Sequence, residues 1–476
     1  MIWENARNLC RDLQRGTVSS QDVMAEVYRR IDAINPQVNA LVALLDRDEA
    51  MALAAAADQV PVAQRGPLHG LPMAPKDAVE VAGFATTWGF GPWQANIARE
   101  DDTFAARMRH AGAIFIGRSN MPEFGLGSNT FNSVYGRTRN PYDVTRTPGG
   151  SSGGAAVALA TGMLPLADGS DMGGSLRNPA SFCNVVGFRP SIGRMPHTRG
   201  FAWFSRHGTT GPMARTVADT AFLFSIQAGP DPTDPLTLPE SGETFLDALV
   251  PLQNLEGLRI AYAPTLHGIP VDPEVLSVMA AAADQLTNLG AEVEQAIPPL
   301  HDAMSVFQVQ RAAGLATLGD ALDRTVPDWR DHAKQTAIWN IEKGQALTAG
   351  EILQSELTRS RIYAEMARFF ESFDAIMLPA AQVPPFHHET EWVDVIDGVQ
   401  METYIDWMTV CCAITVTSCP AISVPGGFTP SGLPVGLQIV TAPRSDLLTL
   451  RLAHCFEQAT RYYEHLPAIG YRPVET

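Results

Sequence analysis

Two glycine-rich loops within residues 146–189 carry serines that could serve as nucleophiles. The first loop is Gly149-Gly150-Ser151-Ser152-Gly153-Gly154, and the second is Gly169-Ser170-Asp171-Met172-Gly173-Gly174-Ser175. Glycine at this density lets the backbone turn sharply and come close to a ligand. The apolar segment 155–166 lies between the loops and predicts a buried packing element. Two polar serine loops held by hydrophobic core are typical of an active site.

A serine hydroxyl becomes a good nucleophile only when a neighbouring base removes its proton. Lys76 is a candidate for this base, because it ends the short apolar, proline-flanked segment Leu71-Pro72-Met73-Ala74-Pro75-Lys76. Most lysines are solvated at the surface, but the apolar approach predicts that this one is buried. Burial lowers the pKa of a lysine toward neutrality and so turns it into a base.

The loops fit other known motifs poorly. A phosphate-binding loop needs a lysine and then a Ser or Thr after its last glycine, whereas Gly154 is followed by two alanines. A nucleophile elbow needs glycine two residues before and after the serine, and Ser175 has Arg177 on the second side. Eleven histidines leave a Ser-His-Asp triad open by count, although none has a constrained context and His387-His388 is expected to be solvated. No H-E-x-x-H motif or Cys/His cluster predicts a metal site.

Long, ordered motifs in the chain resemble the amidase signature family. They are G-G-S-S-G-G and G-S-D-M-G-G-S-L-R-N-P-A in the two loops, P-K-D at Lys76, R-N-P before the first loop, G-P-M-A-R-T-V-A-D from Gly211, S-V-P-G-G-F and G-L-P-V-G-L-Q-I-V near the end, and the pattern around residues 29–44. The likeness covers nearly the whole chain. It implies an α/β fold with a single α/β/α domain, in which helices cover both faces of a large, twisted, mixed central sheet.

The resemblance assigns a Ser-Ser-Lys triad to the matching positions. Ser175 would be the nucleophile, Ser151 a bridging serine and Lys76 the base. A neutral Lys76 could take a proton through Ser151 and later return it to the leaving amine. The family also implies that the peptide bond between Gly150 and Ser151 is cis, a form that persists only where the fold enforces it.

The second loop could also stabilise the negative charge that develops on the attacked carbonyl oxygen. Ser152 is expected to hydrogen bond within the first loop. Asp171 and Arg177 are expected to form a buried pair that holds the second loop, the alternative being a surface ion pair. An oxyanion hole is expected from four successive backbone N–H groups, those of Met172, Gly173, Gly174 and Ser175.

Two further regions are candidates for lining the substrate. A polar loop follows the apolar run at 113–117, and loops at the carboxyl edge of a sheet commonly contact ligands in α/β folds. Core packing is expected for Tyr404, Trp407 and Cys411-Cys412, with a pocket wall as the alternative. Substrate contacts are expected, with an ordinary loop as the alternative, from Gly125, Leu126, Gly127, Ser128 and Asn129.

Strands and helices alternate along the chain, which predicts one domain over residues 1–476. Within it, residues 1–60 are expected to be covering helices, residues 66–230 to hold the triad, and residues 300–410 to shape the substrate pocket as helices and loops. Helices are predicted at 21–34, 50–60, 216–228, 272–290 and 446–460, and strands at 113–117, 257–263, 291–296, 374–378, 421–425 and 434–440.

Composition argues against several classes of protein. The formal net charge is −17, which disfavours nucleic-acid and anionic-membrane partners. Residues 1–12 lack the order of a signal peptide, and no apolar run reaches the ~18 residues of a membrane span. Six cysteines without a C-x-x-C pair indicate reduced thiols. We therefore expect a cytoplasmic homodimer that needs no cofactor or metal and acts on a small-molecule amide.

Together with the resemblance, these residues predict an amide hydrolase. It would cleave a carboxylic amide to an acid and an amine or ammonia through a serine acyl-enzyme, with esters as side substrates. One alternative is the transamidation subunit of a glutamyl- or aspartyl-tRNA amidotransferase-like complex. Another is an inactive binding or scaffold protein, although the intact set of Lys76, Ser151 and Ser175 argues against it. Aromatic residues in 300–345 and 385–415 favour aryl or aliphatic amides over highly charged ones.

Overall fold

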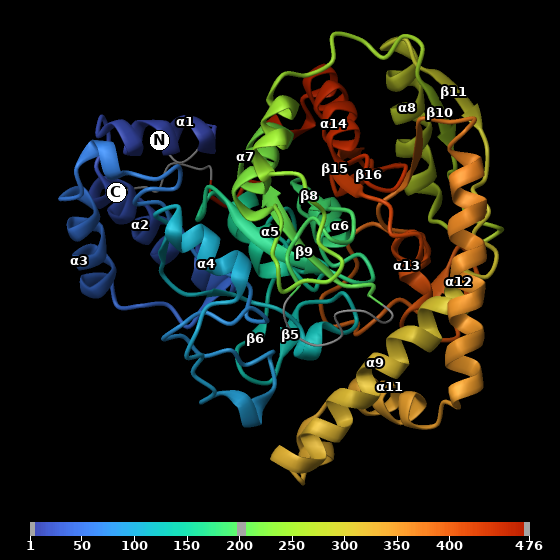
Figure 1. Ribbon diagram of the computed structural model, residues 1–476, viewed down its shortest axis with the longest axis horizontal. Helices are drawn as coiled ribbons and strands as arrows, with labels where there is room; N and C mark the ends of the chain where they lie inside the picture. The colour runs from blue at the N-terminus through green and yellow to red at the C-terminus, as the bar shows by residue number, and fades with distance from the viewer. Residues whose placement is uncertain (1–4, 198–205, 471–476) are drawn as a thin grey trace.

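Within residues 5–197 and 206–470, which the computed structural model describes, an eight-stranded mixed sheet runs through the protein in the order β11-β10-β12-β16-β15-β8-β9-β7 (Figure 1). The ends of the predicted 1–476 unit and its residues 198–205 lie outside the described residues. β10 pairs in parallel with β11 and β12, whereas the other neighbours in this order are antiparallel. The strands are β7 (Ala167–Asp171), β8 (Val186–Arg189), β9 (Thr209–Ala214), β10 (Arg259–Tyr262), β11 (Glu292–Gln295), β12 (Ala375–Pro379), β15 (Ala421–Phe428) and β16 (Pro434–Thr441).

The helices begin at signals that are visible in the sequence. The side chain of Thr216 caps α7 by accepting from the N–H of Asp219, and α8 opens with Pro273 after the cap residue Asp272. The five predicted helices are confirmed, with shifts of a few residues at their ends. The described helices are α1 (Ala6–Arg15), α2 (Ser20–Val38), α3 (Arg47–Asp58), α4 (Thr103–His110), α5 (Gly153–Ala160), α6 (Arg177–Phe182), α7 (Val217–Gln227), α8 (Pro273–Asn288), α9 (Ala303–Thr325), α10 (Trp329–His332), α11 (Gln335–Gln345), α12 (Ala349–Phe369), α13 (Thr409–Val416) and α14 (Asp446–Thr460).

The two faces of the sheet are covered by different helices. On β16, Leu437 and Ile439 enter a hydrophobic core that is shared with α8 and α14. Gly436 points to the opposite face, where a Cβ at this position would lie 2.7 Å from the Cβ of Ser181 in α6. Successive residues of a strand point to opposite faces, so α8 and α14 lie on one side of the sheet and α6 on the other. This arrangement confirms the predicted α/β/α domain.

The predicted strand at 113–117 is shorter than expected and lies outside the central sheet. Only Ile114–Phe115 forms a strand, β3, which pairs in parallel with β2 (Pro72–Met73). Pro72 and Pro75 have no N–H to donate, so this ladder stays short. The pair aligns the segment that leads to Lys76, which forms a single bridge to Ser119. The other short strands are β1 (Leu41–Val42), β4 (Arg118–Ser119), β5 (Phe131–Asn132), β6 (Gly136–Arg137), β13 (Val395–Ile396) and β14 (Val399–Gln400).

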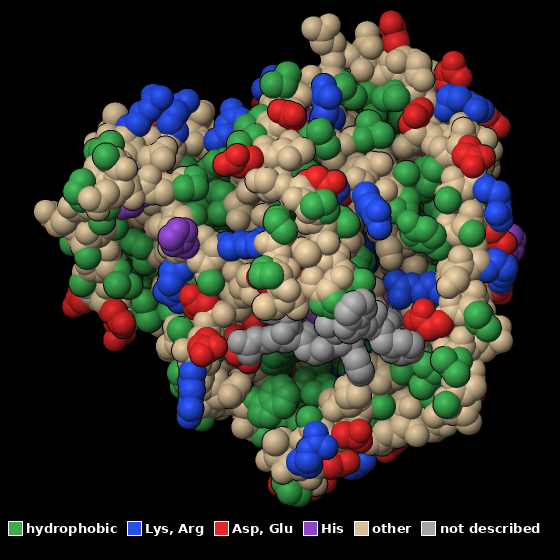
Figure 2. Space-filling model, in the orientation of Figure 1, with side chains coloured by type: hydrophobic (Ala, Val, Ile, Leu, Met, Phe, Trp, Pro, Cys, Tyr) green, Lys and Arg blue, Asp and Glu red, His purple; other side chains and the backbone are tan. Residues whose placement is uncertain are grey.

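A layer of helices stands beside the sheet and includes much of the region 300–410. The long helix α9 packs against α11, α12 and α13, as the yellow and orange ribbons of Figure 1 show. On the face drawn in Figure 2, acidic and basic side chains are interspersed rather than gathered by sign. None of the described helices is both long enough and apolar enough to cross a membrane.

Candidate active site

Lys76 lies at the centre of a cluster of serine hydroxyls. Its Nζ is 2.6 Å from the Oγ of Ser151, 3.0 Å from that of Ser152 and 2.9 Å from that of Ser170. The side chain has no exposed surface. Burial lowers the pKa of Lys76 to about 7, although two nearby aspartates act in the opposite direction. The predicted burial is confirmed, and about half of the amine is uncharged at neutral pH.

Strand β7 anchors the backbone of Lys76 and contributes two residues that the sequence did not suggest. The N–H of Lys76 donates to Oδ2 of Asp168 at 3.2 Å, and burial raises the pKa of this carboxyl to about 6. The carbonyl of Lys76 accepts from Nη2 of Arg118 at 2.8 Å. Asp168 and Ser170 are two residues apart and so lie on one face of β7. A strand prediction at 167–171 would have placed both beside the lysine.

The first serine loop is held by hydroxyl groups from residues 128–130. The Gly150–Ser151 peptide bond is cis, as the resemblance implies. Ser128 donates its hydroxyl hydrogen to the carbonyl of Gly150, and Thr130 donates to the carbonyl of Gly149 at 2.7 Å. A Cβ at Gly153, where α5 begins, would lie 2.2 Å from Oγ1 of Thr130. Glycine at this position therefore allows the loop to lie against its support.

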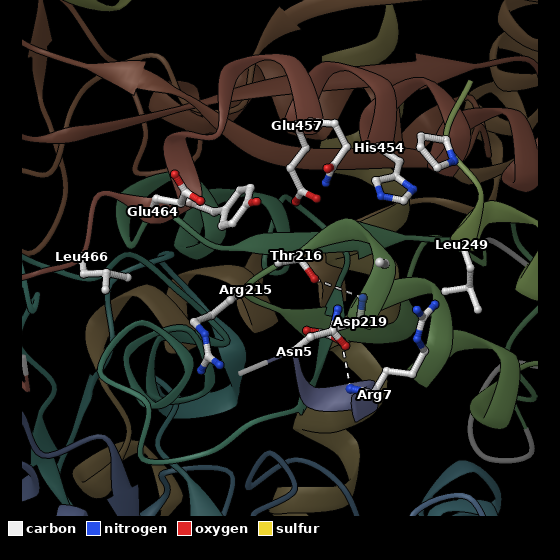
Figure 3. A pocket seen from close by; sticks show the side chains of 14 residues that line it. Asn5, Arg7, Arg215, Thr216, Asp219, Leu249, His454, Glu457, Glu464 and Leu466 are labelled. Atoms are coloured by element: carbon white, nitrogen blue, oxygen red, sulfur yellow. Dashed lines mark hydrogen bonds between the residues drawn. The ribbon is translucent and has the colours of Figure 1, made fainter. Parts of the chain in front are cut away.

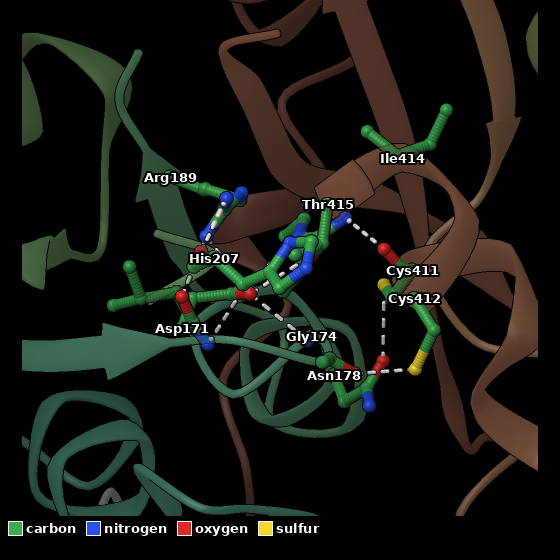
Figure 4. A network of polar contacts seen from close by, with 12 residues as sticks. Asp171, Gly174, Asn178, Arg189, His207, Cys411, Cys412, Ile414 and Thr415 are labelled. Atoms are coloured by element: carbon green, nitrogen blue, oxygen red, sulfur yellow. Dashed lines mark hydrogen bonds and ion pairs between the residues drawn. The ribbon is translucent and has the colours of Figure 1, made fainter. Parts of the chain in front are cut away.

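The second serine loop is fixed by a buried carboxylate between two arginines (Figure 4). Asp171 receives Nε and Nη2 of Arg177 at 2.9 and 2.8 Å, and Nη1 of Arg189 lies 3.7 Å from it. Burial alone would raise the pKa of Asp171, but the two guanidinium groups hold it well below its usual range. The predicted pair of Asp171 and Arg177 is therefore buried, with both side chains unexposed. Arg189 was not foreseen.

Asp171 also changes the expectation for the oxyanion hole. Its carboxylate accepts the N–H of Gly174 at 2.9 Å and that of Leu176 at 3.1 Å, so the Gly174 donor is already used within the loop. In the described part of the chain, no protein acceptor takes the N–H of Met172, Gly173 or Ser175. Three of the four expected donors thus remain available.

Ser175 follows β7 and lies just before α6. Its carbonyl accepts the N–H of Ser152 at 3.2 Å, which joins the two serine loops. Its side chain lines a small cavity of about 60 Å³. Lys76 thus reaches Ser151 directly, while no hydrogen bond within residues 5–197 and 206–470 connects the hydroxyls of Ser151 and Ser175.

The cavity beside Ser175 has walls from two distant parts of the chain. Gly125, Leu126, Gly127 and Ser128 line it, as expected for this loop. Asn129 differs from the expectation, because it is buried with its amide donating to the carbonyl of Thr390 at 2.7 Å and it does not line the cavity. Tyr404 and Cys412 belong to the hydrophobic core and also to the cavity wall. The residues that the sequence did not suggest are Phe307, Arg311, Ile405 and Met408.

A second cavity, of about 600 Å³, lies apart from the serine cluster (Figure 3). Its acidic groups cap helices: Asp219 accepts the N–H of Ala6 and of Arg7 at the start of α1, and Glu457 accepts the N–H of Val217. Burial raises the pKa of Glu457 to about 8. These contacts give the polar groups of this cavity a structural role, and none of the serine-loop residues lines it.

The fold and the Lys-Ser cluster define an enzyme of the amidase class, and comparison with known proteins gives the family. The family model described as Amidase matches residues 22–450. The chain therefore belongs to the amidase signature family. An acylamidase of Rhodococcus erythropolis is 34% identical over 475 residues, covering 98% of this chain and 97% of that protein. The A-type subunit of the glutamyl-tRNA(Gln) amidotransferase of Lysinibacillus sphaericus is 32% identical over 492 residues, covering 98% of both chains.

Solved structures agree with this assignment. A bacterial aryl acylamidase of the amidase signature family superposes with a TM-score of 0.91 at 28% identity, over 99% of both chains. A peptide amidase from Stenotrophomonas maltophilia gives a TM-score of 0.80 at 26% identity, over 96% of this chain and 97% of that one. The protein is an amide hydrolase that cleaves C–N amide bonds, and the alternative of an inactive scaffold is set aside.

Proposed function

We propose that the protein hydrolyses small carboxylic amides through an acyl-enzyme on Ser175, with Ser151 as a proton relay and Lys76 as the general base. The observation that carries this proposal is the buried Lys76, whose pKa is about 7 and whose Nζ lies 2.6 Å from the Oγ of Ser151. A base with a pKa near the working pH combines a useful neutral fraction with a useful driving force for proton transfer.

The proposed reaction proceeds in two halves. As Ser175 attacks the carbonyl carbon, its proton passes to Ser151 while the proton of Ser151 passes to Lys76. The oxyanion of the tetrahedral intermediate accepts from the N–H groups of Met172, Gly173 and Ser175. The proton then returns along the same path to the leaving nitrogen, and the C–N bond breaks. Water attacks the acyl-enzyme with the same base, which releases the acid and restores Ser175.

The residues around this path have supporting roles in the proposal. Ser152 and Ser170 contact the amine of Lys76 at 3.0 and 2.9 Å and hold it toward Ser151. Asp171 and Arg177 fix the second loop, and Asp171 orients that loop through Gly174 and Leu176. The residues Gly125 to Ser128 contribute one wall of the substrate cavity, and the helical region 300–410 contributes the other.

The proposal is tested with a neutral anilide, from which released aniline is measured. Ser175→Ala is expected to lower kcat/KM by at least about 10³-fold, because the nucleophile is lost while the binding groups remain. Ser360→Ala, on the exposed surface of α12, is the matched control. A fluorophosphonate should label Ser175, as read by peptide mass spectrometry. Full activity of Ser175→Ala, or labelling at another residue alone, contradicts the proposal.

A second candidate is the transamidation subunit of a tRNA-dependent amidotransferase, which is favoured by the similarity to such a subunit over 98% of both chains. This role requires partner chains, whereas the proposed amidase does not. The chain expressed alone is therefore run on a size-exclusion column and assayed with the neutral anilide. Turnover by the isolated chain supports the amidase, and turnover that appears only with partner subunits supports the alternative.

We also propose that the enzyme is a homodimer in the cytoplasm. The net charge of −17 and the unpaired cysteines of the sequence support a reducing, aqueous compartment. Light scattering on the purified chain tests the oligomeric state, and cell fractionation tests the location. A monomer, or recovery with the membrane or external fraction, contradicts these two statements.

A further inference from the structure

Arg311 is a buried arginine in the wall of the cavity beside Ser175. It lies on α9, has 5% of its surface exposed, and lines the cavity together with Ser175. Its Nη1 donates to the hydroxyl of Tyr404 at 2.8 Å. Its Nε and Nη2 are buried and have no acceptor among the described residues. Two of the three guanidinium nitrogens are therefore left without a hydrogen bond.

Arg311 also has no counter-ion, which separates it from the other buried arginines that carry an unpaired nitrogen. Arg118, Arg189 and Arg206 each lie within 4 Å of a carboxylate, at 3.8, 3.7 and 2.6 Å. In the described part of the chain, Arg311 forms no such ion pair. The ionisable group that responds to it is another cation, Lys343, whose pKa is lowered by burial and then by Arg311. The wall of the cavity therefore carries positive charge that no protein group neutralises.

The orientation of the guanidinium is fixed by two further elements. The hydroxyl of Tyr404 accepts from Arg311 and also from Nδ2 of Asn340 in α11, at 2.7 Å. The unpaired nitrogens, Nε and Nη2, form the edge of a guanidinium that binds a carboxylate with two parallel hydrogen bonds. Arg177 uses this same edge for Asp171. The open edge of Arg311 thus matches a carboxylate in shape and charge.

The distance between this edge and the reacting centre follows from α9. A Cβ at Gly173, in the loop of the proposed oxyanion donors, would lie 3.2 Å from Cζ of Phe307. Phe307 and Arg311 are four residues apart on α9, so Arg311 lies on the same helix face and about 6 Å further along the axis. A ligand group at Arg311 is therefore a short chain of atoms away from a carbonyl at Ser175.

We propose that Arg311 binds a carboxylate of the substrate, so that the preferred substrates are amides carrying a carboxylate a few atoms from the scissile carbonyl. This inference rests on the proposed function in one respect, the placement of the scissile carbonyl at Ser175. An uncompensated charge buried in a cleft is a mark of a functional site, and the carboxylate supplies the missing counter-ion. It also revises the expectation that aromatic residues here favour uncharged amides.

Two matched pairs of substrates test the inference. In the first pair the acyl side differs, with the monoanilide of glutaric acid against pentananilide. In the second the amine side differs, with 4-acetamidobenzoate against acetanilide. The wild-type enzyme is expected to favour the carboxylate member of at least one pair by about 10- to 100-fold in kcat/KM, the range expected for hydrogen bonds to a charged group. Equal rates within both pairs would overturn the inference.

Substitution of the arginine identifies the group responsible. Arg311→Gln is expected to remove the preference for the carboxylate substrate while changing kcat/KM of its neutral partner by less than about threefold. Arg361→Gln, on the exposed surface of α12, is the matched control and should keep the preference. If Arg311→Gln lowers both members of a pair equally, Arg311 acts on the structure of the site and the inference is wrong.

Binding without turnover separates this inference from the proposed reaction. Glutarate is titrated into the wild-type protein by calorimetry, with glutaramide as the uncharged control. Binding of glutarate that is at least about tenfold weaker in Arg311→Gln supports the carboxylate site even if no anilide is hydrolysed. Absence of glutarate binding to the wild-type protein overturns the inference while leaving hydrolysis of neutral anilides intact. If Arg311→Gln does not fold, the wild-type titration and the substrate pairs still decide.

Discussion

Arg177 and Arg311 are both buried beside the second serine loop, but their guanidinium groups are used in opposite ways. All the N–H donors of Arg177 are directed to acceptors: Asp171 twice, the carbonyl of Cys411, Oε1 of Gln438 and Oγ1 of Thr415. Arg311 makes one hydrogen bond, to Tyr404. The same side chain thus appears once in a closed network and once with an open edge.

The difference separates a structural charge from one available to a ligand. Arg177 and Asp171 neutralise each other, and the carboxylate uses its remaining capacity to hold the N–H groups of Gly174 and Leu176. A guanidinium cannot lose its charge by deprotonation in a protein. An arginine that is buried without an acid therefore keeps an unsatisfied charge until an anion arrives. Arg177 shapes the loop, and Arg311 is left to select what enters beside it.

The largest expected effect comes from opening the closed network. Arg177→Met leaves the Asp171 carboxylate buried without a partner, apart from the longer contact to Arg189. Removing one member of a buried pair lowers the free energy of unfolding by about 3–5 kcal/mol. The loop that carries Ser175 should also lose its geometry, so hydrolysis of a neutral anilide should fall with it. Urea denaturation and the anilide assay measure the two effects.

Arg311→Met is the control that makes the comparison falsifiable. It removes a buried charge that has no counter-ion, so the free energy of unfolding is expected to stay within about 1 kcal/mol of the wild type or to rise. If Arg311→Met destabilises the protein as much as Arg177→Met does, the two arginines have the same structural role. The distinction drawn between them would then be wrong.

Lys76 sharpens the comparison, because it is a buried cation that can lose its charge. Its pKa is lowered to about 7 by burial, and the neutral amine is the form that accepts a proton. The value of kcat/KM should therefore rise about tenfold per pH unit below pH 7 and level off above it. Lys76→Met should remove this step together with most of the activity. A flat profile for the wild-type enzyme between pH 5 and 8 would contradict a base with this pKa.

The same pKa predicts a pH dependence of stability. The ordinary value for lysine is 10.5 and the folded value is about 7, so between these pH values the unfolded chain binds more protons than the folded one. The free energy of unfolding should therefore rise with pH across this window, by at most about 1.4 kcal/mol per pH unit. Urea denaturation of wild type and Lys76→Met isolates this contribution from the cysteines, which titrate in both. Parallel pH curves for the two proteins would count against it.

The sequence predicts the parts of the site that lie in local motifs and misses those that depend on packing between distant segments. Lys76, Ser151 and Ser175 stand in recognisable contexts, and the structure brings Lys76 to Ser151. Arg311 has no motif, because its position depends on how α9 packs against α11 and α13. Asp168 was missed because β7 contains Gly, Ser and Asp, which are poor strand formers, and is held in the sheet by pairing with β9.

The smallest expected effect tests how the open edge of Arg311 is held. Tyr404→Phe removes the hydroxyl that accepts from Arg311 and from Asn340, without emptying the space that the ring fills. Loss of one hydrogen bond to a charged group should raise KM for the carboxylate substrate by about three- to tenfold, because the guanidinium is less well oriented. Its kcat, and both constants for the neutral partner, should change little. Tyr404 is thus a positioning residue, and an equal rise in KM for the neutral substrate would show instead that its ring simply shapes the cavity.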